Sequence, residues 1–342
     1  MKQFTLLSFV FLLTIHFAQA QVHFFKKKCT PRVAFYNVEN LFDTVDDPIK
    51  PDEEFTPEGR QKWSNARYFA KLLKIAKVVE QMDHPAFIGM CEVENRTVLE
   101  DLISRPALNN RAYGIVHHES PDYRGIDVAF LYDKKQFKVK KSQTIRINFP
   151  AEIVEDYTTR DILMVEGTFQ KKQPLYFFIN HWPSRRGGLK ESEPKRTYVA
   201  AQLRKAVDSL FQVNPNAQIM IMGDFNDETD NKSISEVLNA QMESTSVTPQ
   251  QLYNCFAKFD QAKQGSYNFR GNMNMLDQII VSSALMEKSD LSVSNPTIFK
   301  QDWMIYKGTR YGDAPNRTYG GPNYYGGISD HFPVYVDLII PN

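Results

Sequence analysis

Short apolar runs that end abruptly in polar residues recur along this chain, and they restrict its fold more than any other feature. Many short strands with a few helices between them predict two packed sheets flanked by helices, because each sheet has to bury its apolar faces. No internal repeat at a solenoid period and no low-complexity linker interrupts this pattern. The runs with strand composition cover residues 33–38, 85–90, 113–118, 126–132, 137–147, 163–169, 175–179, 219–222, 266–269, 276–281 and 334–340.

Two helices have recognisable starts. Thr56 before Pro57 has the pattern of an N-cap with proline in the first turn, and Ser192 is predicted to cap a second helix. The buried side of the first helix is predicted to carry Phe69, Leu72, Leu73, Ala76 and Val79. The opposite side is predicted to be a solvated face with Lys71, Lys74 and Lys77.

The N-terminal residues Met1–Ala20 have the pattern of a secretory signal peptide. One early lysine precedes an apolar run, and Ala18-Gln19-Ala20 is a small-x-small cleavage site. The run is too short for a comfortable membrane span, and no later stretch is apolar enough to be one. We therefore expect an exported chain, periplasmic or extracellular after cleavage. A flexible lead-in is expected over residues 21–30 and a single domain over residues 31–342.

Charge and cysteine content exclude some partners and sites. The chain has 41 Lys and Arg against 40 Asp and Glu, and loss of Lys2 with the leader would leave 40 of each. This balance argues against bulk electrostatic wrapping of nucleic acid, although a local basic groove remains open. The three cysteines, Cys29, Cys91 and Cys255, allow at most one disulfide and do not have the spacing of a zinc site.

Polar residues that suit metal and proton-transfer chemistry border the strands. Taken singly, each has a plainer explanation: Asn37 as a turn residue, Glu92 as a helix-start carboxylate, and Asp224-Phe225-Asn226 as a turn. Together they are harder to dismiss, because carboxylates are ligands for Mg²⁺ and histidine moves protons near neutral pH. Strand ends gathered on one rim form a natural site. The full set is Asn37, Glu92, Asn180-His181, Asp224 with Asn226, and Asp330-His331.

These motifs, together with Leu276-Asp277-Gln278-Ile279 and Ser329-Asp330-His331-Phe332-Pro333, resemble the endonuclease/exonuclease/phosphatase superfamily, which has the deoxyribonuclease I-like fold. They occur in family order from about Val33 to the C-terminus. The resemblance implies a four-layer α/β/β/α sandwich. It also implies cleavage of phosphate esters that depends on Mg²⁺, with Mn²⁺ or Ca²⁺ as alternatives.

The resemblance also implies roles for individual residues. Glu92 and Asp330 would hold Mg²⁺, with Asn37 hydrogen-bonding nearby. Two His–carboxylate pairs would face the phosphate: His331 oriented by Asp277, and His181 oriented by Asp127. Asp224 would position or activate water, although His331 and Asp224 could exchange the roles of acid and base. The expected phosphate contacts are Asn226 and Arg160.

Two loops are expected to choose the substrate. Arg185 and Arg186 follow His181 closely, so they should lie near the scissile phosphate. The second loop, Tyr306 to Tyr325, interleaves cations with tyrosines, which suits nucleic acid unless the tyrosines pack the loop on itself.

The motifs look most like those of secreted bacterial nucleases, so we expect an exported, monomeric, Mg²⁺-dependent phosphodiesterase that acts on nucleic acid. The alternative is a phosphatase or phospholipase-like enzyme acting on inositol phosphates or phospholipid head groups. The complete set of site residues argues against a non-catalytic binding protein.

Overall fold

The computed structural model describes residues 30–170, 174–242, 247–287 and 291–340. The predicted leader, most of the lead-in and Cys29 lie outside these residues.

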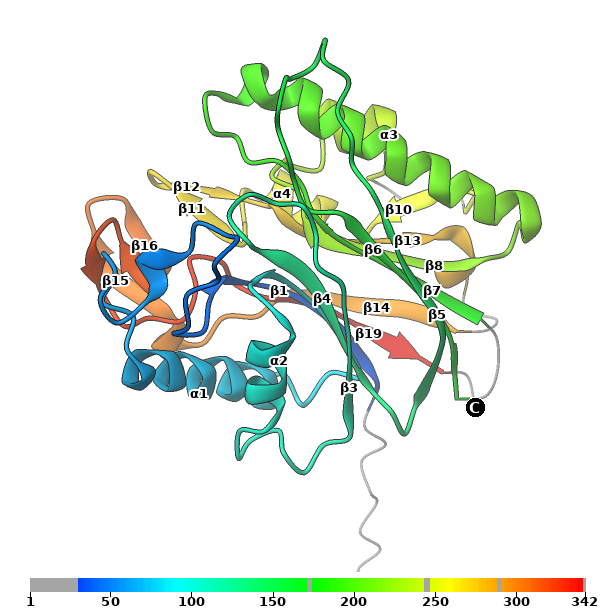
Figure 1. The fold of residues 1–342 in the computed structure, drawn as a ribbon. Coiled ribbons are helices and arrows are strands. Elements are labelled where there is room, and N and C mark those ends of the chain that lie inside the picture. Colours follow the sequence, from blue (N-terminus) through cyan, green and yellow to red (C-terminus); the bar gives the residue numbers. More distant parts are fainter. Residues whose placement is uncertain (1–29, 171–173, 243–246, 288–290, 341–342) are drawn as a thin grey trace, which may run out of the picture.

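Two sheets form the body of the described chain (Figure 1). The strand order of the first sheet is β14 (Ser292–Ile298), β19 (Val334–Ile339), β1 (Arg32–Leu41), β2 (Phe87–Val93), β4 (Asp127–Asp133) and β3 (Tyr113–His117). The order of the second is β5 (Phe137–Ile145), β6 (Ile162–Phe169), β7 (Pro174–His181), β8 (Gln218–Asp224), β13 (Asp277–Ser282), β10 (Leu252–Asn254) and β9 (Ala240–Gln241).

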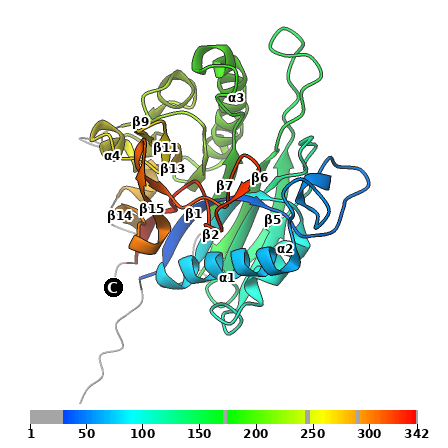
Figure 2. The ribbon, with the colours of Figure 1, turned by 90° about the vertical axis from the view of Figure 1, so that its left-hand side faces the viewer.

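Helices cover the outer faces of both sheets. Figure 2 shows α1 (Asn65–Gln81) on one side of the molecule and α3 (Leu189–Val213) on the other, with the sheets between them. The shorter α2 (Arg96–Ile103) lies beside α1, and α4 (Ala257–Gln261) lies near the edge of the second sheet. Helix, sheet, sheet and helix therefore form four layers, which confirms the predicted α/β/β/α sandwich.

Three hydrophobic cores fill the spaces between these layers, and β1 shows how the sequence supplies them. Val33 and Phe35 face the second sheet, where they pack with Phe177 and Met222. Ala34 and Tyr36 point the other way, into the core under α1. A strand that is apolar on both faces fits only an interior position, because side chains alternate between the faces. The third core packs α3 on the second sheet.

The start and the faces of α1 differ from the prediction. The helix begins at Asn65, and Ser64 caps it by accepting a hydrogen bond from the Arg67 amide. Phe69 and Leu73 are exposed, whereas Lys71 is buried. The prediction for Lys71 was wrong because a distant segment covers that side of the helix. The Lys71 ammonium donates to the Glu39 carbonyl and to Thr318 Oγ1.

The start of α3 also differs from the prediction. The helix begins at Leu189, so Ser192 lies inside it. Gly188 precedes the helix with a φ of 131°, a conformation that L side chains rarely adopt. Ser192 accepts instead from the Arg196 guanidinium.

The C-terminal part of the chain holds more structure than the sequence predicts. Strand β14 was not predicted, and the predicted loop from Tyr306 to Tyr325 is made largely of two hairpins. These hairpins are β15 (Ile305–Thr309) with β16 (Gly312–Pro315), and β17 (Tyr319–Gly320) with β18 (Asn323–Tyr324). A further hairpin pairs β11 (Tyr267–Phe269) with β12 (Asn272–Asn274).

Short helical turns complete the described chain: η1 (Glu53–Phe55), η2 (Ser233–Val237), η3 (Ser283–Leu285) and η4 (Asp302–Met304). None of the described helices combines the length and the apolar character needed to cross a bilayer.

Candidate active site

Three adjacent strands of the second sheet place three predicted site residues in one row. In the parallel pair β7–β8, His181 lies opposite Asp224. In the antiparallel pair β8–β13, Asp277 lies opposite Asp224. The register therefore brings together residues that are 43 and 53 positions apart in the printed sequence, and all three are buried.

The close approach of β7 and β8 depends on Gly223. A Cβ atom at this position would lie 2.6 Å from the Asn180 carbonyl oxygen and 2.7 Å from Asn180 Cβ. Glycine is therefore required for the pairing that sets His181 beside Asp224. Asn180 also stabilises the end of β7, because its Oδ1 accepts a hydrogen bond from Trp182 Nε1.

Glu92 reaches the site from the first sheet through a break in strand pairing. The register of β2 shifts between Cys91 and Val93, and Glu92 has a φ of 61°. This left-handed conformation is uncommon for a non-glycine residue and often marks a functional position. Its Oε2 accepts from the Asn40 amide at 2.9 Å, and its Oε1 lies 3.9 Å from His181 Nε2.

His331 is held on three sides. Its Nδ1 lies 2.6 Å from Asp277 Oδ2, its backbone amide donates to Ser329 Oγ, and the Tyr267 ring lies with its centroid 4.7 Å from the imidazole centroid. Burial alone would lower the pKa of His331, but the combined attraction of Asp277, Asp224 and Asp330 raises this pKa well above its usual value. These acidic neighbours therefore favour the protonated form of His331.

Asp224 lies between the two histidines. Its Oδ2 is 3.7 Å from His181 Nε2 and 3.8 Å from His331 Nε2, so neither contact is a hydrogen bond. Asn37 Nδ2 donates to Oδ2 and the Asn226 amide donates to Oδ1, each at 3.0 Å. Burial raises the pKa of Asp224 to about 6, against the attraction of His331. Asp224 is thus a firmly oriented carboxylate that faces both imidazole rings.

The predicted His181–Asp127 pair is not formed. Asp127 Oδ2 lies 3.2 Å from His117 Nε2, and Asp127 Oδ1 accepts from the Ser120 amide. His181 Nδ1 is buried with no hydrogen-bond partner among the described residues. The prediction failed because Asp127 begins β4, where His117 of the neighbouring strand β3 and the Ser120 amide already bind both of its carboxylate oxygens.

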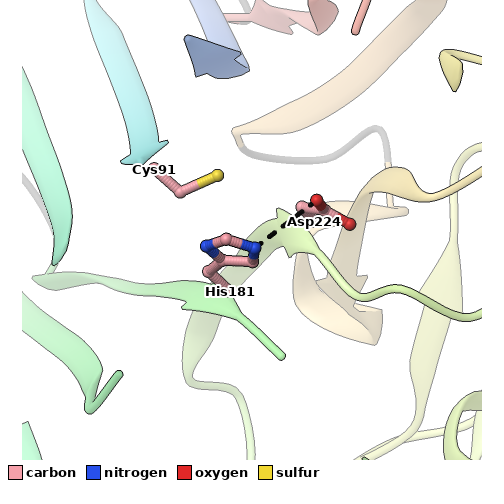
Figure 3. Close-up of side chains that lie close together, drawn as sticks. All are labelled: Cys91, His181 and Asp224. Atoms are coloured by element: carbon pink, nitrogen blue, oxygen red, sulfur yellow. Dashed lines mark ion pairs between the residues drawn. The ribbon is translucent and has the colours of Figure 1, made fainter. Parts of the chain in front are cut away.

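The surroundings of His181 are unlike those of His331. Figure 3 shows Cys91, near the end of β2, above the His181 ring, with Asp224 beside one edge of the same ring. Burial, together with the positive charge of Arg160, lowers the pKa of His181 well below its usual value. Burial likewise raises the pKa of the Cys91 thiol, so this thiol stays protonated. His181 is therefore a neutral imidazole.

Two of the predicted phosphate-binding arginines mainly hold the protein together. The Arg160 guanidinium donates to Asp122 at 2.9 Å and to the carbonyls of His181 and Trp182. Arg185 donates to the carbonyl of Asn226. Asn226 has a φ of 51°, and its side chain donates to the Trp182 carbonyl. These bonds lock the loops after β7 and β8 to each other.

Oxygen ligands suitable for a divalent cation lie on the wall of the same cavity. Among the described residues, no hydrogen bond reaches Glu92 Oε1 or Asp330 Oδ1, while Asp330 Oδ2 accepts from Arg317 at 3.1 Å. Arg124 is within 4.0 Å of Glu92 Oε1, and the net effect of nearby cations and the Asn40 amide outweighs burial and lowers the pKa of Glu92. Carboxylates with an oxygen that accepts no hydrogen bond match the ligand preference of Mg²⁺.

Groups of three side chains elsewhere around the site could also share a metal ion. Cys91, His181 and Asp224 form one such group, and Asp224, Asp277 and His331 form another, each with its ligand atoms within 4.8 Å of one another. A third group, around His117 and Asp127, includes the exposed Glu119.

A cavity of about 780 Å³ collects most of the predicted site residues. Its walls include both histidines, Asp224, Asn226, Glu92, Asp330 and the predicted arginines Arg160, Arg185 and Arg186. Asn37, Asp277 and Asp127 are not on its walls. Asn37 and Asp277 instead form hydrogen bonds to residues of the wall, Asn37 to Asp224 and Asp277 to His331.

Several residues at the site were missed by sequence reasoning. Ser329 Oγ donates to the Asn37 carbonyl and accepts from the His331 amide, which ties β1 to the last strand. Lys195, Tyr123 and Tyr157 line the cavity, but nothing in their sequence context indicates this. Ser329 could have been recognised, because it begins the motif that contains Asp330 and His331.

Only one of the two predicted substrate loops lines the cavity. Residues 184–189 lie on its wall, whereas residues 306–325 do not. In the second loop, the rings of Tyr306 and Tyr325 stack on each other with centroids 6.2 Å apart, and Tyr319 packs against Trp63. Tyr319 therefore packs on the protein itself, the alternative left open for the tyrosines, whereas Tyr306, Tyr311 and Tyr325 stay about half exposed.

The family model described as Endonuclease/Exonuclease/phosphatase family matches residues 32–339. No curated protein sequence gives a significant match.

Solved structures with this fold match at low sequence identity. A mannosyl-6-phosphatase from Bacteroides thetaiotaomicron VPI-5482 has 18% identity and a TM-score of 0.54, covering 91% of this chain and 100% of its own. A D. rerio TDP2 complexed with single strand DNA product has 14% identity and a TM-score of 0.54, covering 91% and 99%. The human Nocturnin catalytic domain with bound sulfate has 16% identity and a TM-score of 0.51, covering 91% and 95%. These likenesses establish the fold.

Proposed function

This chain belongs to the endonuclease/exonuclease/phosphatase family of metal-dependent phosphoric ester hydrolases, and from that premise we propose that it is a Mg²⁺-dependent nuclease. The observation that carries the proposal is the pair of histidines on either side of Asp224, with their Nε2 atoms 3.7 Å and 3.8 Å from Asp224 Oδ2. A phosphodiester between them would meet an imidazolium and a neutral N–H donor, while Asp224 would accept a proton from the attacking water. The surrounding cavity, with cations and aromatic rings on its walls, suits nucleotides.

The residues have separate tasks in this proposal. His331, charged and held by Asp277, donates from Nε2 to a phosphate oxygen or to the leaving oxygen. Asp224, held by Asn37 and by the Asn226 amide, orients the water for in-line attack. Glu92 and Asp330 would hold Mg²⁺, and the chemistry that Mg²⁺ supplies when bound is neutralisation of charge on the phosphate oxygens.

A panel of substrates tests the proposal. Plasmid DNA, single-stranded DNA, RNA and bis-p-nitrophenyl phosphate are incubated with the purified protein in Mg²⁺ and in EDTA. We expect cleavage of nucleic acid in Mg²⁺ and none in EDTA, with Mn²⁺ and Ca²⁺ as comparison cations. The His331→Ala variant is the control for contaminating nuclease. Failure of the wild type to cleave any diester would refute the proposal.

A phosphomonoesterase is the second candidate function. The mannosyl-6-phosphatase of similar fold favours it, as does a cavity of the size of a small-molecule site. Inositol phosphates, phospholipid head groups and mannose 6-phosphate therefore belong in the same panel. Release of inorganic phosphate from these, without diester cleavage, would select this function instead.

We also propose that the chain is exported, that residues 31–342 act as one domain and that the protein is a monomer. The leader-like pattern of Met1–Ala20 supports export. Mass spectrometry of the N-terminus after secretion tests cleavage next to Gln21, and sedimentation equilibrium tests the monomer.

A further inference from the structure

The cavity is larger than one phosphate requires. Its volume of about 780 Å³ lies within the range of pockets that hold whole small-molecule ligands. Five arginine and lysine residues line it: Arg124, Arg160, Arg185, Arg186 and Lys195. What each of these cations already contacts decides which of them remain available to a substrate.

Three of the five already have acidic or carbonyl partners. Arg160 forms a buried ion pair with Asp122 at 2.9 Å. Arg185 donates to the Asn226 carbonyl at 2.7 Å and to Asn231 at 3.0 Å. Arg124 lies 3.8 Å from Asp122 and 4.0 Å from Glu92, so it balances the charge of two carboxylates.

The other two cations have no acidic partner in the described part of the chain. Arg186 is exposed, and its guanidinium makes no hydrogen bond or ion pair with the described residues. Lys195 is half-buried, and its ammonium lies 4.6 Å from the centroid of the Tyr157 ring. A cation on a cavity wall without a counter-charge attracts an anionic group of a ligand.

Exposed aromatic rings lie on the same cavity wall. Tyr123 and Phe269 are each 52% exposed. Such rings can stack on bases, which favours a ligand that carries both phosphates and planar groups.

We propose that Arg186 and Lys195 form a subsite for a second phosphate of the substrate, adjacent to the phosphate that lies between the two histidines. The inference rests on the proposed nuclease function and deepens it. The preferred substrate is then a strand with at least two consecutive phosphates, and an isolated diester is a poor substrate. Arg186 and Lys195 set specificity and take no part in proton transfer.

The test compares a substrate with one phosphate and a substrate with two. Thymidylyl-thymidine has a single internal phosphate, and its 5′-phosphorylated form has a second. We expect the wild type to prefer the two-phosphate substrate in kcat/KM. In the Arg186→Ala, Lys195→Met double variant, kcat/KM should fall about tenfold or more for the two-phosphate substrate, because charge-assisted hydrogen bonds are lost. For thymidylyl-thymidine, the change should stay below about twofold because no such bond exists.

Lys190→Ala is the matched control. Lys190 is an exposed lysine in the first turn of α3, and it does not line the cavity. An equal loss on both substrates, or an equal loss in the control, would overturn the second-phosphate subsite while leaving the nuclease intact. Failure of the wild type to cleave either substrate would refute the nuclease proposal itself, and the inference with it.

A binding measurement adds a readout that does not depend on turnover. In the His331→Ala background, affinity for the two-phosphate dinucleotide is measured at physiological salt by fluorescence anisotropy. We expect the double substitution to weaken binding of this ligand about tenfold or more. Unchanged affinity would overturn the proposal.

Discussion

The two histidines of the site stand at strand borders in different surroundings. His331 precedes β19 and is held by Asp277, Ser329 and the Tyr267 ring. His181 ends β7, and its Nδ1 has no partner in the described structure. The Arg160 guanidinium instead binds the backbone carbonyl of His181.

This difference shifts the pKa values of the two histidines in opposite directions. The acidic neighbours of His331 raise its pKa, whereas burial and the nearby Arg160 lower the pKa of His181. A histidine at the border of a strand therefore acquires its role from the side chains that adjacent strands bring to it. The four predictions below test this contrast.

The largest effect is expected from replacing each histidine by glutamine, which keeps an N–H donor but cannot carry a proton. His331→Gln should lower kcat about 10³-fold, within the range for loss of general acid–base catalysis. His181→Gln should lower kcat only about tenfold, because a neutral donor is replaced by another. Steady-state kinetics on a diester substrate measures both. Equal losses would mean that the two histidines share one role.

The partners of the histidines provide the next contrast. Asp277→Asn should lower kcat about 10²-fold by removing the charge that keeps His331 protonated. Asp127→Asn is the matched control and should change kcat less than about twofold, because Asp127 binds His117 and Ser120. Melting temperatures of both variants separate loss of folding from loss of catalysis. A large fall in kcat for a well-folded Asp127→Asn variant would contradict this contrast and support the predicted role of Asp127 in orienting His181.

A third prediction concerns pH. Asp224 accepts a proton only as the carboxylate, and its pKa is raised to about 6. The active form is therefore present above this pKa and is lost as the pH falls through it. Below about pH 6, kcat/KM should fall roughly tenfold per pH unit, as for a single titrating group. A profile that stays flat down to pH 4.5 would contradict the role of Asp224 as the base.

The smallest effect is expected from replacing Arg317, which pairs with Asp330 next to His331 in the sequence. The Arg317 guanidinium lies 3.1 Å from Asp330 Oδ2 and 3.7 Å from Glu39 Oε1, and its side chain is 47% exposed. Arg317→Met should lower the Mg²⁺ concentration for half-maximal activity two- to fivefold or so, because a partly screened competing cation is removed. Arg310→Met, an exposed position outside the cavity, serves as the control. A higher Mg²⁺ requirement would mean that Arg317 orients Asp330 rather than competing for it.

The sequence by itself determined the layers of this fold and most of its site. Apolar runs such as residues 33–38 and 219–222 can be buried only inside packed sheets, and they carry Asn37 and Asp224 into the same cavity region. The motif Ser329–Pro333 indicated His331, and the pairing of His331 with Asp277 was predicted correctly. The apolar runs are local in sequence, and the motifs occur in the same order as in the family that the chain resembles.

Only the tertiary structure decided which distant residues meet. The Asp127 side chain binds a histidine in its own sheet, and Lys71 is buried by a segment more than 240 residues away. Arg185 and Arg186 are neighbours in sequence, yet the first holds a loop and the second remains available. Composition and spacing cannot separate such cases, because the free energy of a charged side chain depends on the groups that the fold places around it.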